Sequence, residues 1–361
     1  MAEPEHIAPR DGVKVSEDDH LEPPTHIERH QGITTNAKPG HLPSSVLAAL
    51  VKGDEVIGVN QYGTSLWADT KKIDVKTAEG STRSYFLKAT VPFQTMNVSD
   101  AAKRVYGEYE AMSAIYNTMP SIVPKPCGYG LYDRENRTHF FLCDYLDITH
   151  ELPDSVKLGK ELANFHIKSK SPTGKFGFHC TTFDGKNPLN TSWDSSWTSY
   201  FRRLMRDIYE LEKAANGYSK EFDDVIQLAL DKVIPRLLGA LVADGRTIKP
   251  TLIHGDLWES NIGTDPATGQ IYIFDACAYY AHHEKEVGIW RCAHHRMTDE
   301  KYRREYFRHY PPSEPREEAD DRNRLYAAQT MIVTSLDFPG RGMRELIMED
   351  LNYLIDKYEL R

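Results

Sequence analysis

The stretch that decides the fold reads Ile253-His254-Gly255-Asp256-Leu257-Trp258-Glu259-Ser260-Asn261, and soon after it comes Gln270-Ile271-Tyr272-Ile273-Phe274-Asp275. Asp256 and Asn261 stand five positions apart, and Asp275 follows an apolar strand. The intervening residues 264–269 are rich in turn formers, so we expect a hairpin that brings Asn261 near Asp275. The sequence therefore predicts that two carboxylates and an amide lie close together.

The spacing of Asp256 and Asn261 equals that of the Asp and Asn in the protein-kinase catalytic loop, H-R-D-x-x-x-x-N. A phosphoryl transferase needs a carboxylate to accept the proton of the attacking hydroxyl, and it needs oxygen ligands for magnesium. The pattern therefore indicates phosphoryl transfer. The alternative is a structural turn with solvated acids, because each element of the pattern is common by itself.

A kinase also needs a cation on the nucleotide phosphates, and Lys88 fits this requirement. It is the basic residue of the apolar strand 84–89, where a lysine is expected to face a ligand or solvent. The following helix, 101–117, offers Glu108 and Glu110 as ion-pair partners, and we favour Glu108. The alternative is a solvated edge-strand lysine beside two surface glutamates.

Two further segments are candidates for nucleotide contact. Residues 58–65, which include Gly58 and Asn60, could fold over the phosphates through backbone N–H groups, or they could form an ordinary hairpin. The segment Asp144-Tyr145-Leu146 stands where a kinase hinge would bind adenine through its backbone, with the Asp144 side chain facing solvent.

Composition limits the class of protein. The 361 residues include 53 acidic and 44 basic side chains, a net charge of −9, which argues against a nucleic-acid groove. No apolar stretch is long enough to span a bilayer, and the start lacks a signal-peptide pattern, so we expect no membrane partner. Five cysteines without a C-x-x-C pair suit a reducing compartment, and we expect a cytoplasmic protein.

Hydrophobic patterning predicts a disordered tail at residues 1–40, a nucleotide-binding lobe at 41–147 and a catalytic, substrate-binding lobe at 148–361. The second lobe is expected to be mostly helical after an N-cap at Asp154, with strand character only at 250–275. The elements expected in the first lobe are a short helix at 46–50, two strands within 56–67, a strand at 84–89, the helix at 101–117 and a hairpin whose second strand is 139–146.

These segments together resemble the fructosamine-3-kinase, or ketosamine-3-kinase, family, which includes protein-ribulosamine 3-kinases and is distantly related to aminoglycoside phosphotransferases and protein kinases. The family's H-G-D-L-W-x-x-N corresponds to His254–Asn261, and its F-D-P-A-x-x-Y-G-H-x-E corresponds to Phe274–Glu284. The match runs from about residue 45 to the C-terminal helix. Further matches lie at Phe86–Ala89, Gly107-Glu108, Val123–Pro126, Leu162–His166, Phe176–Phe178 and Asn190–Trp197.

The resemblance implies an α+β, bilobal protein kinase-like fold, with a small antiparallel sheet and one main helix in the first lobe and mostly helices in the second. It also implies phosphorylation, with ATP and Mg²⁺, of the 3-hydroxyl of a ketoamine. The acceptor would be a ketosamine small molecule or a glycated protein lysine. In the family the phosphorylated adduct breaks down and frees the amine, which amounts to deglycation.

The resemblance further implies a role for each matching residue. Asp256 would be the catalytic base, Asn261 and Asp275 would hold Mg²⁺, and Lys88 would contact the phosphates while paired with Glu108. Three more residues have two possible roles each: Trp258 could pack against the sugar or in the core, and His282 and Glu284 could line the substrate cleft or brace a loop.

Departures from the family pattern leave the substrate open. Ala276 and Ala281 replace the family's proline and glycine, and residues 334–338 lack the histidine and asparagine that the family tends to have there. The rival hypotheses are a pseudokinase, another small-molecule kinase of the same fold, and, less favoured on spacing, a metal-binding protein that uses the histidines at 282–295. The natural sugar, the amine and the oligomeric state stay undecided at this point.

Overall fold

The computed structural model describes residues 42–63, 68–90, 98–135 and 137–361, which all belong to one compact unit, Asn36–Arg361. For residues 98–100 it describes the helical backbone alone. The tail predicted at residues 1–40 lies outside the described residues. Among the helices of the described part, none is both long and apolar enough to cross a bilayer.

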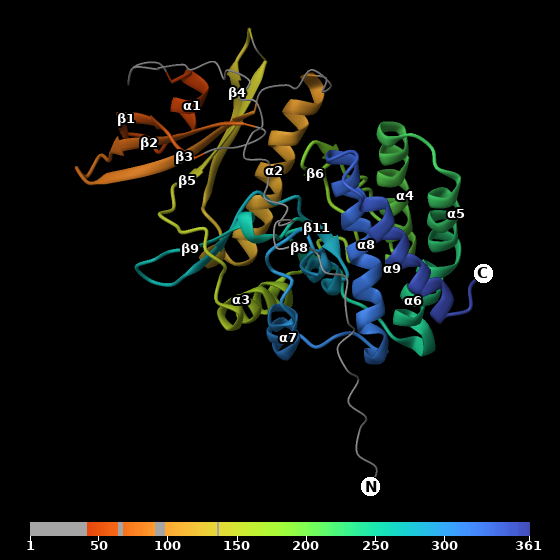
Figure 1. Ribbon diagram of the computed structural model, residues 1–361. Helices are drawn as coiled ribbons and strands as arrows, with labels where there is room; N and C mark the ends of the chain where they lie inside the picture. Colours follow the sequence, from red (N-terminus) through yellow and green to blue (C-terminus); the bar gives the residue numbers. More distant parts are fainter. Residues whose placement is uncertain (1–41, 64–67, 91–97, 136) are drawn as a thin grey trace, which may run out of the picture. The chain divides into compact units, whose positions relative to one another are not determined.

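Within the described residues, five antiparallel strands form the large sheet, in the order β1-β2-β3-β5-β4 (Figure 1). Their bounds are β1 Glu55–Gln61, β2 Asp69–Lys76, β3 Thr82–Thr90, β4 Pro126–Asp133 and β5 Thr138–Asp144. The strand predicted at 84–89 and the hairpin ending at 139–146 are confirmed as β3 and as β4 with β5.

Of the two strands predicted within 56–67, the first is confirmed as β1, whereas residues 64–67, where the second would lie, are outside the described residues. The next strand of the sheet, β2, was not predicted. This strand contains lysines at positions 71 and 72, and its apolar residues are Ile73 and Val75. Both apolar side chains are buried, but two residues are too few to produce a clear alternating pattern in a charged segment.

The large sheet is covered by a helix on each face, as Figure 1 shows. Helix α1, Ser44–Ala49, packs Val46 into a cluster with Ile73, Tyr85 and Leu142. Helix α2, Val98–Thr118, packs against the opposite face, where Met112 and Ile115 join a cluster that contains Phe141. Successive residues of a strand point to opposite faces, which is why neighbours in β5 belong to different clusters.

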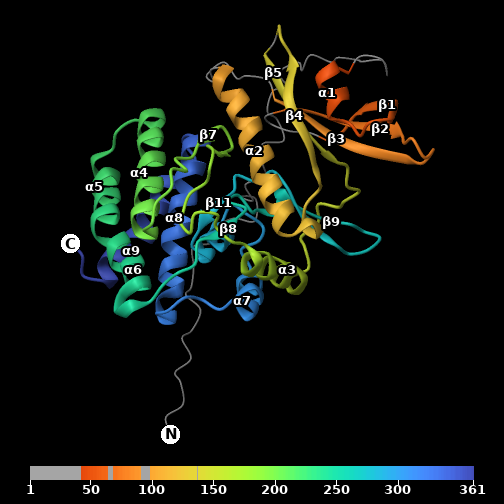
Figure 2. The same ribbon diagram turned by 180° about the vertical axis from the view of Figure 1, so that it is seen from behind.

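The remaining elements are mainly helical, as predicted. Asp154 caps α3 by accepting a hydrogen bond from Lys157 N at 2.8 Å, which confirms the predicted N-cap. Helices α4, α5, α8 and α9 pack together with α6 (Figure 2). The bounds are α3 Ser155–Lys168, α4 Trp197–Asn216, α5 Lys220–Leu228, α6 Ile234–Gly239, α7 Glu300–His309, α8 Ala319–Asp337 and α9 Met343–Lys357, with a π-helical turn at Ala229–Val233 and 3-10 turns at Pro120–Ile122, Ala240–Gly245, Glu259–Asn261, His283–Arg291 and Arg316–Glu318.

Within the part of the chain that the structure describes, three pairs of short strands lie among these helices and position the loops of the site. The hairpin predicted between Ile262 and Ile271 is confirmed, because β9 and β10 pair antiparallel with Ile273 opposite Ile262. Beyond that pair, Phe274 N donates to Asn261 O at 3.1 Å, so the residue before Asp275 is tied to Asn261. The strands are β6 Phe183–Asp184 with β7 Asn187–Pro188, β8 Thr251–Ile253 with β11 Tyr279–Ala281, and β9 Ile262–Thr264 with β10 Ile271–Ile273.

Candidate active site

The loop that follows β8 is held by contacts to its backbone. Glu286, a buried residue, accepts hydrogen bonds from the backbone amides of His254 and Gly255. The His254 ring donates through Nε2 to Phe274 O at 2.8 Å, and burial lowers the pKa of this histidine. Gly255 has φ +90°, and a Cβ there would lie 2.8 Å from Cys277 O, so no other residue fits without a shift of the backbone. These contacts fix His254 and Gly255, the residues that directly precede Asp256.

Asp256 and Asn261 are in direct contact. Asn261 Nδ2 donates to Asp256 O at 2.8 Å and to Asp256 Oδ2 at 3.0 Å. Desolvation and the negative charge of Asp275 raise the pKa of Asp256 to about 7, although the hydrogen bond from Asn261 opposes this rise. A carboxylate with a pKa near neutrality is suited to exchange protons at neutral pH.

Lys88 joins the large sheet to the loop after β10. Its Nζ donates to Glu108 Oε1 at 3.0 Å and to Asp275 Oδ1 at 2.8 Å. Burial would lower the pKa of Lys88, but the charges of Asp275 and Glu108 outweigh it and raise the pKa. For Glu108, burial has the larger effect and raises the pKa to about 7 against the opposing influence of Lys88. Asp275 has φ +61°, an uncommon backbone conformation for a residue with a side chain.

These five residues line one cavity of about 120 Å³. The structure therefore brings together Lys88, Glu108, Asp256, Asn261 and Asp275, although they are up to 187 positions apart in the chain. Trp258, which is partly buried, lies in the same wall. The complete lining consists of Lys88, Arg104, Glu108, Phe183, Gly185, Asp256, Trp258, Asn261, Asp275 and Ala276.

Four of the lining residues were not predicted as site residues, and one of them, Ala276, was noted only as a departure from the family pattern. Phe183 and Gly185 come from the β6–β7 hairpin, whose two-residue strands are too short to give a periodic signal. Arg104 lies one helical turn before Glu108, and this spacing could have revealed it because side chains four positions apart share a helix face. A single arginine on a helix is more often solvated, so the spacing alone did not single it out.

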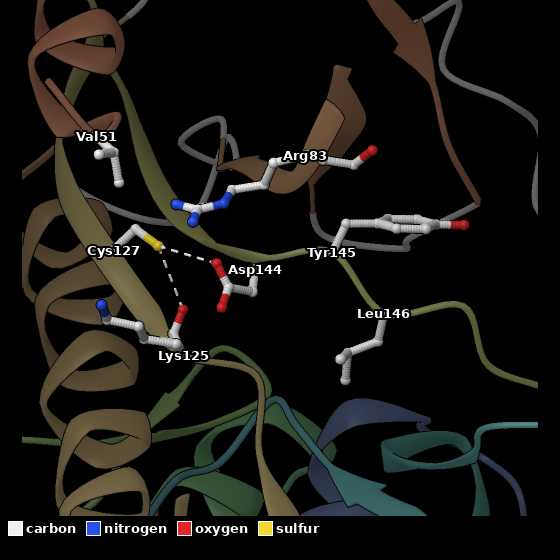
Figure 3. Close-up of a pocket in the computed structure, with 8 residues that line it drawn as sticks. Val51, Arg83, Lys125, Cys127, Asp144, Tyr145 and Leu146 are labelled. Atoms are coloured by element: carbon white, nitrogen blue, oxygen red, sulfur yellow. Dashed lines mark hydrogen bonds between the residues drawn. The ribbon is translucent and has the colours of Figure 1, made fainter. Parts of the chain in front are cut away.

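The segment expected to act as a hinge lies at the end of β5. Asp144 pairs with Tyr85, on the α1 face of the large sheet, whereas Lys88 pairs with Phe141, on the α2 face. The Asp144 side chain therefore points away from the face of Lys88. It lines a separate hollow of about 350 Å³ (Figure 3), where Cys127 Sγ lies 3.7 Å from Asp144 Oδ1. The lining residues of this hollow are Val51, Arg83, Ser84, Lys125, Cys127, Asp144, Tyr145 and Leu146.

The backbone of the same segment is partly engaged. Asp144 N donates to Lys125 O at 3.0 Å, and Tyr145 N donates to Ser84 O at 3.1 Å. These two amides cannot also donate to an adenine base. The Tyr145 ring faces Tyr62, with ring centroids 5.0 Å apart, and Lys72 lies over it.

Gly58 and Asn60 lie within β1, opposite Asp74 and Lys72, and are therefore strand residues. The turn that would cover a ligand begins after Gln61, and Gly63 has φ +69°. Residues 64 and 65 of the predicted phosphate-covering segment lie outside the described residues, so the contact between this segment and phosphates stays a prediction.

The structure does not bring His282 or Glu284 to the cavity that contains Asp256. His282 is buried, and its two ring nitrogens bind Tyr326 Oη and Ser313 Oγ, each at 2.9 Å. Glu284 is buried as well and forms a bidentate ion pair with Arg322 at 2.8 and 2.9 Å. These contacts correspond to the loop-bracing alternative of the sequence prediction. With His283 they form a cluster whose potential ligand atoms lie within 4.8 Å, but hydrogen bonds occupy the ring nitrogens of His282.

The sheet, the flanking helix α2 and the mostly helical remainder form an α+β, bilobal protein kinase-like fold, and solved structures share it. A putative fructosamine-3-kinase from Thermobifida fusca superposes with a TM-score of 0.67 at 18% identity, over 86% of this chain and 98% of that one. Aminoglycoside phosphotransferase APH(4)-Ia superposes with a TM-score of 0.55 at 16% identity, over 87% and 98%. The Lys88–Glu108 pair and the Asp256 loop thus lie in a protein kinase-like fold.

The chain belongs to the fructosamine kinase family, whose family model matches residues 69–352. It is 27% identical over 275 residues to the chloroplastic protein-ribulosamine 3-kinase of Oryza sativa subsp. japonica, over 74% of this chain and 76% of that protein. It is 29% identical over 224 residues to the ketosamine-3-kinase of Mus musculus, over 55% and 68%. The chain is therefore a phosphotransferase that acts on a hydroxyl group, and family membership implies ATP as its substrate.

Proposed function

We propose that the protein phosphorylates the 3-hydroxyl of a ketosamine, a ribulosamine or fructosamine, on a free amine or a protein lysine, and that this leads to deglycation. The observation that carries the proposal is the convergence of Lys88, Glu108, Asp256, Asn261 and Asp275 on one cavity in a chain of this family. The names of the relatives from rice and mouse support the choice of a ketosamine acceptor.

We assign the proton transfer to Asp256. Its carboxylate faces the cavity, and its pKa of about 7 leaves a large ionised fraction at neutral pH to accept the proton of the acceptor hydroxyl. Trp258, two residues further along the same wall, offers an aromatic face for the sugar ring. The proposal does not include His282 or Glu284 as substrate contacts, because both are buried in the network around Arg322 and Tyr326.

We assign the triphosphate to Lys88, which Glu108 holds in place, and Mg²⁺ to Asn261 and Asp275. The residues fit a magnesium ion because they offer oxygen ligands, which this cation prefers. Both hydrogen bonds from Asn261 Nδ2 go to Asp256, so Oδ1 is the atom that Asn261 can offer to a cation. Bound there, Mg²⁺ would supply positive charge against the phosphates. For the adenine we propose backbone groups at Leu146, because the amides of Asp144 and Tyr145 are engaged.

We also propose that residues 41–147 form the nucleotide-binding lobe and residues 148–361 the catalytic, substrate-binding lobe. The proposal also includes a cytoplasmic location, which the free state of all five cysteines supports, and which cell fractionation would test. Relatives from rice and Arabidopsis thaliana are named as chloroplastic, and recovery of the protein from an organelle would contradict this part of the proposal.

A panel of acceptors tests the reaction and its alternatives together. Purified protein with ATP and Mg²⁺ is offered fructosyl-lysine, ribulosyl-lysine and an aminoglycoside, and ADP formation is measured. Turnover of a ketosamine supports the proposal. Turnover of the aminoglycoside alone would favour the related small-molecule kinases, and ATP binding without any turnover would favour a pseudokinase.

The base is tested by Asp256→Asn. We expect unchanged ATP affinity and a turnover at least ~100-fold lower, which is the contribution of a positioned base. Asp224→Asn, an exposed residue of α5, serves as the control for removing a carboxylate. Near-normal turnover of Asp256→Asn would reject Asp256 as the base.

A further inference from the structure

Arg104 is a buried cation that lines the cavity of Lys88 and Asp256. Its relative exposure is 7%, and its Nη1 has no hydrogen-bond partner among the described residues. Its place on α2, one turn before Glu108, puts it on the helix face that looks into the cavity. Buried charges in proteins are normally paired, because an isolated one loses its hydration without compensation.

The carboxylates of the cavity do not satisfy this guanidinium. Glu108 and Asp275 both bind Lys88, and Asp256 binds Asn261. Burial lowers the pKa of Arg104, and the negative charges of Glu108, Asp275 and Asp337 only partly oppose it. The cavity therefore contains two cations. Lys88 has two carboxylate partners, whereas Arg104 keeps an N–H donor that can bind a ligand.

We propose that Arg104 binds an oxyanion that enters the cavity with a substrate. This inference rests on the proposed function and adds an anion-binding residue to it. The shared chemistry is an oxygen of a phosphate or a carboxylate, which a guanidinium binds through charge-assisted hydrogen bonds. Two sources meet this description: the terminal phosphate of ATP, and a carboxylate on the acceptor, as in the ketosamine of an α-amino acid.

The neighbours of Arg104 allow both sources. Asp275, which we assign to Mg²⁺, contributes to the electrostatic environment of Arg104. Gly185 of the β6–β7 hairpin lines the same cavity, and Asn187 of this hairpin donates to Asp337 Oδ1 at 2.9 Å. Arg104 thus shares its cavity both with a group assigned to the metal of the triphosphate and with a hairpin available to the acceptor.

The experiment compares Arg104→Met, which removes the charge, with Arg104→Lys, which keeps it. Lys103→Met, an exposed neighbour on the same helix, is the control for the change in net charge. In the first arm, calorimetry measures the affinities for ATP and for ADP in the presence of Mg²⁺. In the second arm it measures, with ADP and Mg²⁺ present, the affinities for ribulosyl-glycine and for ribulosyl-ethylamine, which lacks the carboxylate.

If the anion is the terminal phosphate, Arg104→Met lowers the ratio of ATP to ADP affinity by roughly 10- to 100-fold, the effect of one charge-assisted hydrogen bond. If the anion is on the acceptor, the same loss appears for ribulosyl-glycine relative to ribulosyl-ethylamine. Arg104→Lys should restore part of the loss. Ratios within twofold of wild type in both arms would overturn the proposal.

Stability provides an independent readout. If Arg104 serves binding and has no partner in the free protein, Arg104→Met should unfold at the same temperature as wild type or at a higher one. If Arg104 has a structural role, the variant should unfold at a lower temperature. A variant that fails to fold would therefore also overturn the proposal. The two proposals can fail separately. Absence of ketosamine turnover by the wild-type protein would refute the proposed function, whereas the comparison of ATP with ADP affinity would still test Arg104 because it measures binding alone.

Discussion

Replacing Gly107 with alanine tests how closely α2 approaches the segment before the β6–β7 hairpin. A Cβ at Gly107 would lie 2.4 Å from Thr181 O and 3.3 Å from Thr182 Cα. Both are backbone atoms, so no side chain can rotate away, and the helix would have to shift by about 1 Å to reach a normal contact distance. Arg104 and Glu108 lie on the same helix and would move with it.

The expected loss of stability combines two opposing effects. Alanine is favoured over glycine inside a helix by about 1 kcal/mol, whereas overpacking costs roughly 1–3 kcal/mol or more. We expect Gly107→Ala to lower the free energy of unfolding by up to about 2 kcal/mol. The matched control is Gly239→Ala in α6, where a Cβ would meet nothing within 4 Å, and where we expect a gain of about 0.5–1 kcal/mol.

Urea unfolding of both variants measures this difference, and steady-state kinetics on a ketosamine measures its effect on the site. Because a displacement of about 1 Å near the reacting groups can cost about 100-fold in rate, we expect Gly107→Ala to lose turnover while Gly239→Ala keeps it. If Gly107→Ala were as stable and as active as Gly239→Ala, α2 would not lie against Thr181, and the placement of Glu108 in the cavity would be refuted.

Three further predictions concern the cleft and the network behind it. Lys88→Met should weaken ATP binding or lower turnover by at least ~10-fold, since it removes a charge-assisted contact, and unchanged values of both would exclude Lys88 from the phosphate site. Arg322→Met leaves Glu284 buried without its ion-pair partner and should lower the free energy of unfolding by about 3–5 kcal/mol. Adding Glu284→Gln should restore part of this loss. If the effects of the two substitutions were simply additive, the two residues would not be coupled. Burial sets the pKa of His282 and His283 well below the usual value. Below pH ~6.5 the unfolded chain therefore binds protons that the folded chain does not. As the pH falls, the free energy of unfolding should decrease by up to ~1.4 kcal/mol per pH unit for each histidine. Urea unfolding between pH 8 and 5.5 should give a shallower slope for His283→Gln than for wild type, and equal slopes would contradict the buried, neutral state of His283.

The part of the site that could be predicted from the sequence is the part in which spacing dictates geometry. Asn261 and Asp275 flank a short hairpin, so the turn residues between them were enough to place them together. The resemblance to a kinase predicted that Lys88 and Asp275 belong to one site, but their direct contact was not predicted, because no local pattern relates residues 187 positions apart. Arg104 shows the limit of this reasoning, since its importance depends on which side chains leave it without a partner.

His282 and Glu284 show a second limit. Their place directly after the Asp275 strand is compatible with a substrate contact and with a bracing role, and the sequence contains nothing that separates the two. The outcome is decided by more distant parts of the chain: Arg322 of α8 binds both carboxylate oxygens of Glu284, and Tyr326 of α8 and Ser313 bind the two ring nitrogens of His282. The same holds for Asp144, whose side chain faces α1 only because of its register with Tyr85 in the large sheet.

The contacts that hold the catalytic loop are separate from the groups that we assign to chemistry. Glu286 binds the amides of His254 and Gly255, and Trp290 Nε1 donates to Leu257 O at 2.7 Å. Neither residue lines the cavity of Asp256. The loop backbone is therefore fixed from behind, and among the described residues the Asp256 carboxylate accepts one hydrogen bond, from Asn261, so this carboxylate can still meet a substrate in the cavity. The motif identifies the side chains that face the cavity, whereas the exact positions of these side chains depend on residues, such as Glu286 and Trp290, that lie outside the motif.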